Sequence, residues 1–457
     1  MAIVAKISEF LFGNSTFAVR IFPALIGAAS VIVIALIVKK LGGKFWAILI
    51  ACFAFIISPA FLRSNSLFQP VSFNQFYWLL TAYFVVVLIQ TQNPKFWIHL
   101  FVLWGLAFLN KYSIAFLIVA FFPALLLTKD RKLILTKQFI WGAIIGFFII
   151  LPNLIWQFSH NWPVVHHMLE LQRTQLVNVR IGDFFMSQLL MNIPNLLVWV
   201  FGLLFLLFFK DGKPYRILGY TFIFVILVLI LLRGKPYYTL GIYTTLFAVG
   251  GFAIEKYFTN RLRLAKPLIL VVMLFFSLPI IPYSLPILPF DKMIVYAEKS
   301  KQYGVEEALR WEDGRIHQLP QDYADMIGWK ELGLTVAKAY HSLNEEEKSR
   351  CAIYAENYGE AGAIKYYGKK YKLPEPICFN GSFLFWAPDS LNINSLIYVN
   401  DDTSEISLYF NSVKQVGGIT NIYARENGLP VFLCRGPRNN FEEFYRNKVR
   451  KLKSNYR

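Results

Sequence analysis

Long apolar runs separated by short polar loops fill the first two thirds of the chain. Ten of these runs are long enough, or nearly so, to cross the hydrocarbon core of a bilayer as helices. They cover residues 22–38, 45–60, 71–89, 96–109, 114–127, 138–156, 183–209, 217–232, 239–255 and 267–282. Residues 1–290 are therefore predicted to form an all-α polytopic membrane domain with about ten transmembrane helices.

The pattern changes after residue 290, where polar and apolar residues mix as they do in soluble proteins. A helical pattern over 326–343 is followed by short β-type runs. These runs cover residues 351–354, 396–399, 406–410 and 431–434. We expect residues 291–457 to form a small, soluble α/β domain.

The charges of the loops between the apolar runs predict how the first domain is oriented. Alternate loops carry very different numbers of cations. One set holds fifteen: Lys39, Lys40, Lys44, Lys95, Lys129, Arg131, Lys132, Lys137, Lys210, Lys213, Arg216, Lys256, Arg261, Arg263 and Lys266. The other set holds six: Arg63, Lys111, Arg173, Arg180, Arg233 and Lys235. The positive-inside rule places the first set in the cytoplasm, so both termini and the second domain face outward. A single helix over 96–127 would invert every later loop and lose this bias, so two helices are predicted there.

The overall composition changes this picture little. The formal net charge is +18, yet in the first domain the cations occupy short loops between apolar spans, as in a membrane protein. A nucleic-acid partner is therefore not predicted, whereas membrane lipids are. The four cysteines have no metal-ligand spacing.

Most candidate binding residues lie in the outward loops. The longest, between the spans that end near residue 156 and start near 183, offers four candidates for substrate binding: His166, His167, Glu170 and Arg173. His166 and Glu170 are four residues apart and would share a helix face, which suits a hydrogen-bonded pair or two ligands of a divalent cation. No third ligand is apparent, so no metal site or cofactor is assigned. Alternatively, these residues hydrate a helix lying at the membrane surface.

Two further outward loops combine cations with phenols. One contains Arg233, Lys235, Tyr237 and Tyr238, and another contains Lys111 next to Tyr112. Arginine and lysine form charge-assisted hydrogen bonds to phosphate oxygens and neutralise negative charge that develops on a departing phosphate. We interpret Arg233, Lys235, Tyr237, Tyr238 and Lys111 as candidate phosphate-binding residues, with snorkelling at helix ends as the alternative.

A series of short strings runs through the chain: LFGNSTFAVR, FQPVSFNQFYW, LNKYS, LPNLIWQ, RTQLVN and GKPYY, followed by DYADMIGW and NYGEAGAI in the second domain. In this order they resemble bacterial membrane glycosyltransferases of family 39, which include protein mannosyltransferases and lipid A aminoarabinose transferases. The resemblance implies a C-type glycosyltransferase fold in the bacterial plasma membrane. It also implies an isoprenyl-phosphate-linked sugar donor, an outward active site and an extracytoplasmic acceptor that is a lipid, a glycan or a protein.

The resemblance leaves the catalytic residue unassigned. The family carries its principal catalytic acid in a first outward loop, ahead of the segment resembling LFGNSTFAVR, and that loop is not part of the printed sequence. We therefore expect a further helix and loop upstream of Met1. Asn74 is an amide where the resemblance implies a second possible acidic position. Two alternatives follow: a catalytically silent protein that binds lipid-linked sugar, and a lipid or sugar transporter, although no internal repeat indicates the latter.

Overall fold

The computed structural model describes residues 1–174, 176–178, 180–259 and 262–456. Arg261, one of the loop cations predicted to be cytoplasmic, lies outside the described residues. The contacts divide the chain into two compact units. The first unit comprises Met1–Phe158 and Trp162–Leu285, and the second comprises Ser159–Asn161 and Pro286–Arg457.

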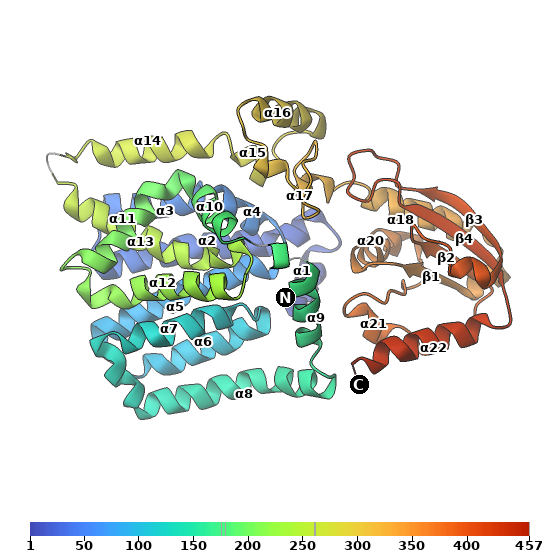
Figure 1. Ribbon diagram of the computed structural model, residues 1–457, viewed down its shortest axis with the longest axis horizontal. Coiled ribbons are helices and arrows are strands. Elements are labelled where there is room, and N and C mark those ends of the chain that lie inside the picture. The colour runs from blue at the N-terminus through green and yellow to red at the C-terminus, as the bar shows by residue number, and fades with distance from the viewer. Residues whose placement is uncertain (175, 179, 260–261, 457) are drawn as a thin grey trace. The chain divides into compact units, whose positions relative to one another are not determined.

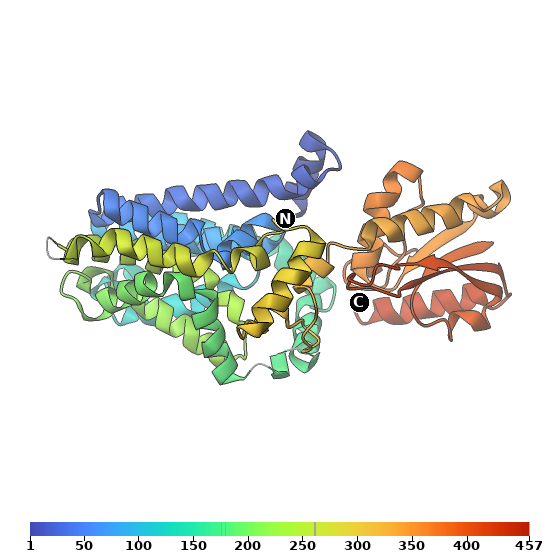
Figure 2. The same cartoon turned by 90° about the horizontal axis from the view of Figure 1, so that it is seen from above.

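The first unit is built from helices that mostly run side by side (Figures 1 and 2). They are α1 (Ala2–Phe12), α2 (Thr16–Leu41), α3 (Phe45–Ile56), α4 (Pro59–Ser66), α5 (Pro70–Thr91), α6 (Phe96–Asn110), α7 (Ile114–Leu126), α8 (Lys137–Ser159), α9 (Pro163–Thr174), α10 (Ile181–Met191), α11 (Leu196–Phe208), α12 (Arg216–Leu231), α13 (Leu240–Tyr257), α14 (Ala265–Ser277) and α15 (Ile281–Ser284).

Each of the ten predicted spans coincides with a helix or a pair of helices. Within the described residues, five segments are long and apolar enough to cross a bilayer: α2, α5, α8, and α12 and α13 each with the short turn before it. Three shorter apolar helices, α6, α7 and α14, match further predicted spans. The chain leaves helical geometry between Asn110 and Ile114, which confirms two helices over 96–127.

Two predicted spans fall on pairs of helices with a sharp bend between them. Residues 45–60 fall on α3 and α4, which are bent by 61°, and residues 183–209 fall on α10 and a second helical segment bent by 65°. Each break contains a proline: Pro59 begins α4, and Pro194 lies in the 3-10 turn Ile193–Asn195. Because proline has no N–H and clashes with the preceding turn, it ends one helix and starts another. The apolar pattern continues across both breaks and does not reveal them.

Helix α13 is the centre of the first unit. Every residue from Leu240 to Ile254 is buried, against α2, α3, α5 and α11. Close packing depends on two adjacent glycines. A Cβ atom on Gly250 would lie 2.0 Å from the Val198 carbonyl oxygen of α11, and one on Gly251 would lie 2.5 Å from the Ala47 carbonyl oxygen of α3. Small residues let helix backbones approach closely where the surroundings are apolar. This central helix begins directly after the Arg233–Tyr238 loop.

The other end of α13 carries a carboxylate that caps α3. Glu255 accepts hydrogen bonds from the backbone N–H groups of Lys44 (2.6 Å), Trp46 (2.9 Å) and Ala47 (3.2 Å). The first N–H groups of a helix have no partner within the helix, and its N-terminus favours a negative charge. Glu255 therefore joins α13 to α3.

Replacing Glu255 with alanine should lower the free energy of unfolding by about 2 kcal/mol, because it leaves several helix N–H groups without an acceptor and removes a favourable charge. The measurement is the melting temperature of the detergent-purified protein. Glu255→Gln retains one acceptor oxygen and should give an intermediate value. An unchanged melting temperature for Glu255→Ala would show that the cap does not stabilise the fold.

The second unit contains a four-stranded sheet in the order β1-β2-β4-β3. Its strands are β1 (Cys351–Ala355), β2 (Ser395–Val399), β3 (Phe410–Gly418) and β4 (Pro430–Pro437). β1 and β2 are parallel and the other pairs are antiparallel. The accompanying helices are α16 (Phe290–Gln302), α17 (Gln321–Ala324), α18 (Trp329–His341), α19 (Glu345–Ser349), α20 (Tyr358–Gly368), α21 (Phe383–Trp386) and α22 (Phe441–Ser454).

Alternating residues of the strands bury opposite faces of this sheet. Ile353 and Ile397 pack with α18 and α20 on one face, whereas Ala352, Leu396 and residues of α22 pack on the other (Figure 1). The period of two is that of a strand buried on both faces. The sheet is thus covered on both sides by helices, and the predicted α/β class is confirmed.

Three of the four predicted strands coincide with β1, β2 and β4. The fourth prediction, 406–410, is wrong: Ile406–Leu408 forms a 3-10 turn and β3 begins only at Phe410. Most of β3 after Phe410 is exposed or half-buried, because it lies at an edge of the sheet. Its residues therefore need no apolar alternation, and the sequence pattern that marks a strand is missing.

Candidate functional site

The turn between α6 and α7 brings together several of the sequence strings singled out above. Asn110 ends α6, and its side-chain amide donates to the Pro70 carbonyl oxygen at the start of α5, at 3.0 Å. Tyr112 donates to Asn153 of α8 at 2.9 Å and accepts from Gln157 of α8 at 2.9 Å. The strings FQPVSFNQFYW, LNKYS and LPNLIWQ therefore meet at this turn.

Lys111, between Asn110 and Tyr112, faces the GKPYY string. Its ammonium lies 5.2 Å from the ring centroid of Tyr237 and 5.1 Å from that of Tyr238. The two phenol rings contact each other edge to face at 4.7 Å, and Tyr238 also stacks on Phe116 of α7 at 5.9 Å. An aromatic face attracts a cation at this range. We call Lys111, Lys235, Tyr237 and Tyr238 the Lys111 cluster.

The electrostatics of the Lys111 cluster favour an anion. Burial of the Lys111 ammonium, together with repulsion from Lys235, lowers its pKa to about 8. Two cations held near each other and partly removed from water disfavour their own charged state. An anion bound between them would offset both effects, since it would restore the lost solvation and screen the repulsion.

Gln188 of α10 holds the loop that carries the two phenols, and the sequence analysis did not single it out. Its amide nitrogen donates to the Pro236 carbonyl oxygen at 3.2 Å, and its amide oxygen accepts from the Thr239 hydroxyl at 2.6 Å. The Tyr243 hydroxyl donates to the same oxygen at 3.2 Å. Gln188 is 5% exposed. Its position as a polar residue within an apolar stretch of the sequence was the signal that could have identified it.

Several buried polar atoms in the first half of α5 and at the start of α7 have no hydrogen-bond partner among the described residues. They are Asn74 Oδ1, Gln75 Nε2, Trp78 Nε1 and Ser113 Oγ. Trp78 packs against Gly241, in the first turn of α13, where a Cβ atom would lie 2.7 Å from its ring. Unsatisfied buried groups are rare and often mark a site for water or a ligand. Trp78 thus lies beside the start of α13.

The remaining candidates lie apart from these contacts. Arg233 follows α12 in a left-handed conformation, with φ of 50°, and its side chain is exposed. His166, His167, Glu170 and Arg173 are exposed on α9. No group of three or more His, Cys, Asp or Glu side chains in the described part of the chain could hold a metal ion.

Residues 1–156 match the family described as dolichyl-phosphate-mannose-protein mannosyltransferase. This match covers about a third of the chain and includes Asn74, Lys111, Tyr112 and Asn153. The resemblance to family-39 glycosyltransferases is confirmed by it. A comparison with curated protein sequences gives no match.

Two solved structures share the fold. One is the crystal structure of ArnT from Cupriavidus metallidurans bound to undecaprenyl phosphate, with a TM-score of 0.62, and the other is the same protein in the apo state, with a TM-score of 0.58. Each is 13% identical, and each match covers 95% of this chain and 88% of that chain. The chain therefore has the fold of a membrane glycosyltransferase, and the predicted C-type fold is confirmed.

Proposed function

We propose that the chain is a membrane glycosyltransferase that takes a sugar from an isoprenyl-phosphate carrier and transfers it to an extracytoplasmic acceptor. The observation that carries this proposal is the Lys111 cluster, in which half-buried Lys111 contacts two phenol rings and lies close enough to half-buried Lys235 to be repelled by its charge. The same fold in ArnT is described as bound to undecaprenyl phosphate. The combination supports an isoprenyl phosphate as the anion that the two lysines bind.

The cluster suits a phosphate because its groups have complementary tasks. Lys111 and Lys235 supply compact positive charges that neutralise phosphate oxygens. Tyr237 and Tyr238 hold the Lys111 ammonium through their ring faces. Gln188 fixes the backbone of the loop at Pro236, so the lysine and the phenols of this loop keep their positions without the ligand. A preorganised site of this kind stabilises developing charge without having to rearrange.

The reaction follows from this placement. An acceptor hydroxyl attacks the anomeric carbon, the bond from that carbon to the phosphate oxygen breaks, and the configuration at the carbon inverts. The lysines stabilise the negative charge that grows on the departing isoprenyl phosphate. The acceptor proton passes to a general base, and no residue of this chain is assigned to that role.

The lysines account for the phosphate of the donor, and the buried side-chain amides and hydroxyl that have unpaired atoms suit its sugar. Asn74, Gln75 and Ser113 are buried, and each has an unused donor or acceptor atom. Sugar hydroxyls both donate and accept, so they can satisfy such groups. We propose that these residues contact the donor sugar. His166, His167, Glu170 and Arg173, exposed on α9, are proposed to contact the acceptor, and Arg233 the carrier at the membrane surface.

The orientation belongs to the same proposal. The loops with most cations are placed in the cytoplasm of a bacterium, and the Lys111 cluster together with the second unit on the outer side of the plasma membrane. Nucleotide-linked sugars are cytoplasmic, so an outward site requires a donor that has already crossed the membrane on a lipid.

The test is release of undecaprenyl phosphate from undecaprenyl-phosphate-linked sugars by purified protein in lipid nanodiscs. It is run on the printed chain and on a chain extended upstream from genomic DNA. Turnover by either form supports the transferase. Binding of the donor without turnover by both forms would favour a silent binding protein, and movement of the intact donor across the bilayer would favour a transporter.

A further inference from the structure

The second unit contains a groove that the proposed reaction does not use. It has a volume of about 560 Å³, large enough for a small ligand. Its floor and walls come from the start of β1, the segment 374–377 and the segment 383–393. All these parts belong to one compact unit, so the groove is a feature of that unit alone.

An exposed indole dominates one wall of the groove. Trp386, at the end of α21, is 73% exposed although its side chain is large and apolar. Phe383 holds it edge to face at 5.5 Å, which restricts its motion. Pro374, Pro376 and Pro388 add rigid apolar surface around it. A flat aromatic face that is left uncovered and held in place can stack on a flat apolar surface of a ligand.

Polar side chains surround this apolar surface. Arg350 and Asn392 are exposed on the groove and offer a guanidinium and an amide, and Ser349 adds a hydroxyl. Lys365 and Glu375 form an ion pair at 2.7 Å and line the same groove. The lining therefore presents donors and acceptors next to an aromatic platform. A ligand that matches an aromatic surface next to hydrogen-bonding groups has an apolar C–H face and many hydroxyl groups.

An extended peptide fits this groove poorly. Peptides commonly bind a sheet by adding a strand at its edge, and β1 is an edge strand. The edge of β1 is already occupied from Ile353 onward, where Ile377 donates to the Ile353 carbonyl oxygen at 2.8 Å and accepts from Ala355 N–H at 2.9 Å. Only Cys351 and Ala352 of this described strand are left, which is too short for strand addition.

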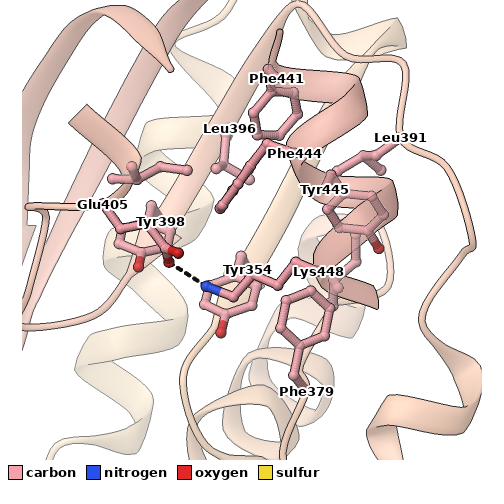
Figure 3. Close-up of a pocket in the computed structure, with 12 residues that line it drawn as sticks. Tyr354, Phe379, Leu391, Leu396, Tyr398, Glu405, Phe441, Phe444, Tyr445 and Lys448 are labelled. Carbon is pink, nitrogen blue, oxygen red and sulfur yellow. Dashed lines mark hydrogen bonds and ion pairs between the residues drawn. The ribbon is translucent and has the colours of Figure 1, made fainter. Parts of the chain in front are cut away.

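The neighbouring pocket in Figure 3 does not offer the same space. It lies between the sheet and α22, shares Ile377 and Leu391 with the groove, and has a volume of only about 40 Å³. The ion pair of Lys448 with Glu405 lines it, as do buried Tyr398 and Phe441. A space of this size holds little more than water molecules. The groove is therefore the ligand-sized cavity of the two.

We propose that the groove beside Trp386 is a saccharide-binding site. The C–H face of a sugar ring stacks on the Trp386 indole, and its hydroxyls bond to Arg350 and Asn392. If the protein is the proposed glycosyltransferase, which this step presupposes, the groove holds a carbohydrate-containing acceptor, and the acceptor class narrows to glycans and glycolipids.

The test is saturation-transfer-difference NMR on the full chain in lipid nanodiscs, with mannotriose and a trimer of β-1,4-linked N-acetylglucosamine as probes. At least one probe should receive saturation mainly on the protons of one ring face. Trp386→Ala should weaken that binding about tenfold, and Trp386→Phe, which keeps an aromatic face, should weaken it less. Tyr303→Ala removes another exposed aromatic residue of the second unit, 84% exposed and outside the groove, and should change nothing.

The outcomes separate the two proposals. Binding that depends on Trp386 but not on Tyr303 supports the saccharide site, whether or not donor turnover is observed. Absence of binding for both sugars, or equal binding by wild type and Trp386→Ala, overturns it. Release of the donor sugar to water does not involve the groove, so intact donor release without saccharide binding would reject the groove alone. Saccharide binding without any donor turnover would reject the role of the groove as an acceptor site.

Discussion

Replacing Lys235 with alanine is expected to weaken binding of undecaprenyl phosphate about 10- to 100-fold. A hydrogen bond to a charged group contributes about 1.5–3 kcal/mol, which corresponds to this range of affinity. Lys235 lies in the loop ahead of α13, close enough to Lys111 to lower its pKa, so its loss removes one of the two charges that face the phosphate. The measurement is the dissociation constant from native mass spectrometry of the protein in nanodiscs.

The matched control is Lys95→Ala. Lys95 is an exposed lysine beside an apolar helix of the same unit, at the start of α6, whereas Lys111 follows the end of that helix. Affinity for undecaprenyl phosphate should not change in this variant, and both variants should keep the wild-type melting temperature. Equal loss of affinity in the two variants would mean that net charge alone, rather than the Lys111 cluster, attracts the lipid.

Binding of undecaprenyl phosphate should weaken about tenfold as the pH rises through about 8. Burial and the nearby Lys235 lower the pKa of Lys111 to about 8, so the side chain loses its charge in the range where an ordinary lysine keeps it. The protonated lysine attracts the phosphate and the neutral one does not, so the favourable contact is present below this pKa and lost above it. Dissociation constants between about pH 7 and about pH 9.5 measure the effect, since the phosphate itself titrates at lower pH.

Lys111→Arg provides the control for this pH dependence. An arginine stays protonated across the whole range, so the affinity of the variant should be nearly independent of pH above about 7. A variant that shows the same loss of affinity as the wild type would place the titrating group elsewhere. A wild-type protein whose affinity does not change with pH would contradict the role of Lys111 in binding the phosphate.

The helical part of the fold could be predicted from the sequence because apolar length is a direct physical requirement of a membrane span. The loop at Lys111 was also predictable, because a lysine inside a single long span would be costly and would reverse the charge bias of the later loops. The bends at Pro59 and Pro194 were not predicted, since hydropathy measures composition over a window and says nothing about helix direction. Strand β3 was missed because its exposed residues carry no apolar period.

The candidate site was predictable only in part. Lys111, Lys235, Tyr237 and Tyr238 were recognisable one loop at a time, because a cation beside a phenol at a helix end is a local pattern. These residues lie close together only because of the way in which α6, α7 and α12 pack, and no local sequence pattern specifies that packing. Gln188 is far from the loop in sequence, and its role appears only through the hydrogen bonds to Pro236 and Thr239. The general base stays unassigned for this chain.

The most direct test of the proposed site is an experimental structure of the protein in lipid nanodiscs with undecaprenyl phosphate. The proposal predicts the phosphate within about 3 Å of the Lys111 and Lys235 ammonium groups, at the end of the loop that Gln188 holds. Phosphate density at another place, such as the exposed Arg173 of α9, with the Lys111 cluster unoccupied, would contradict the proposed site.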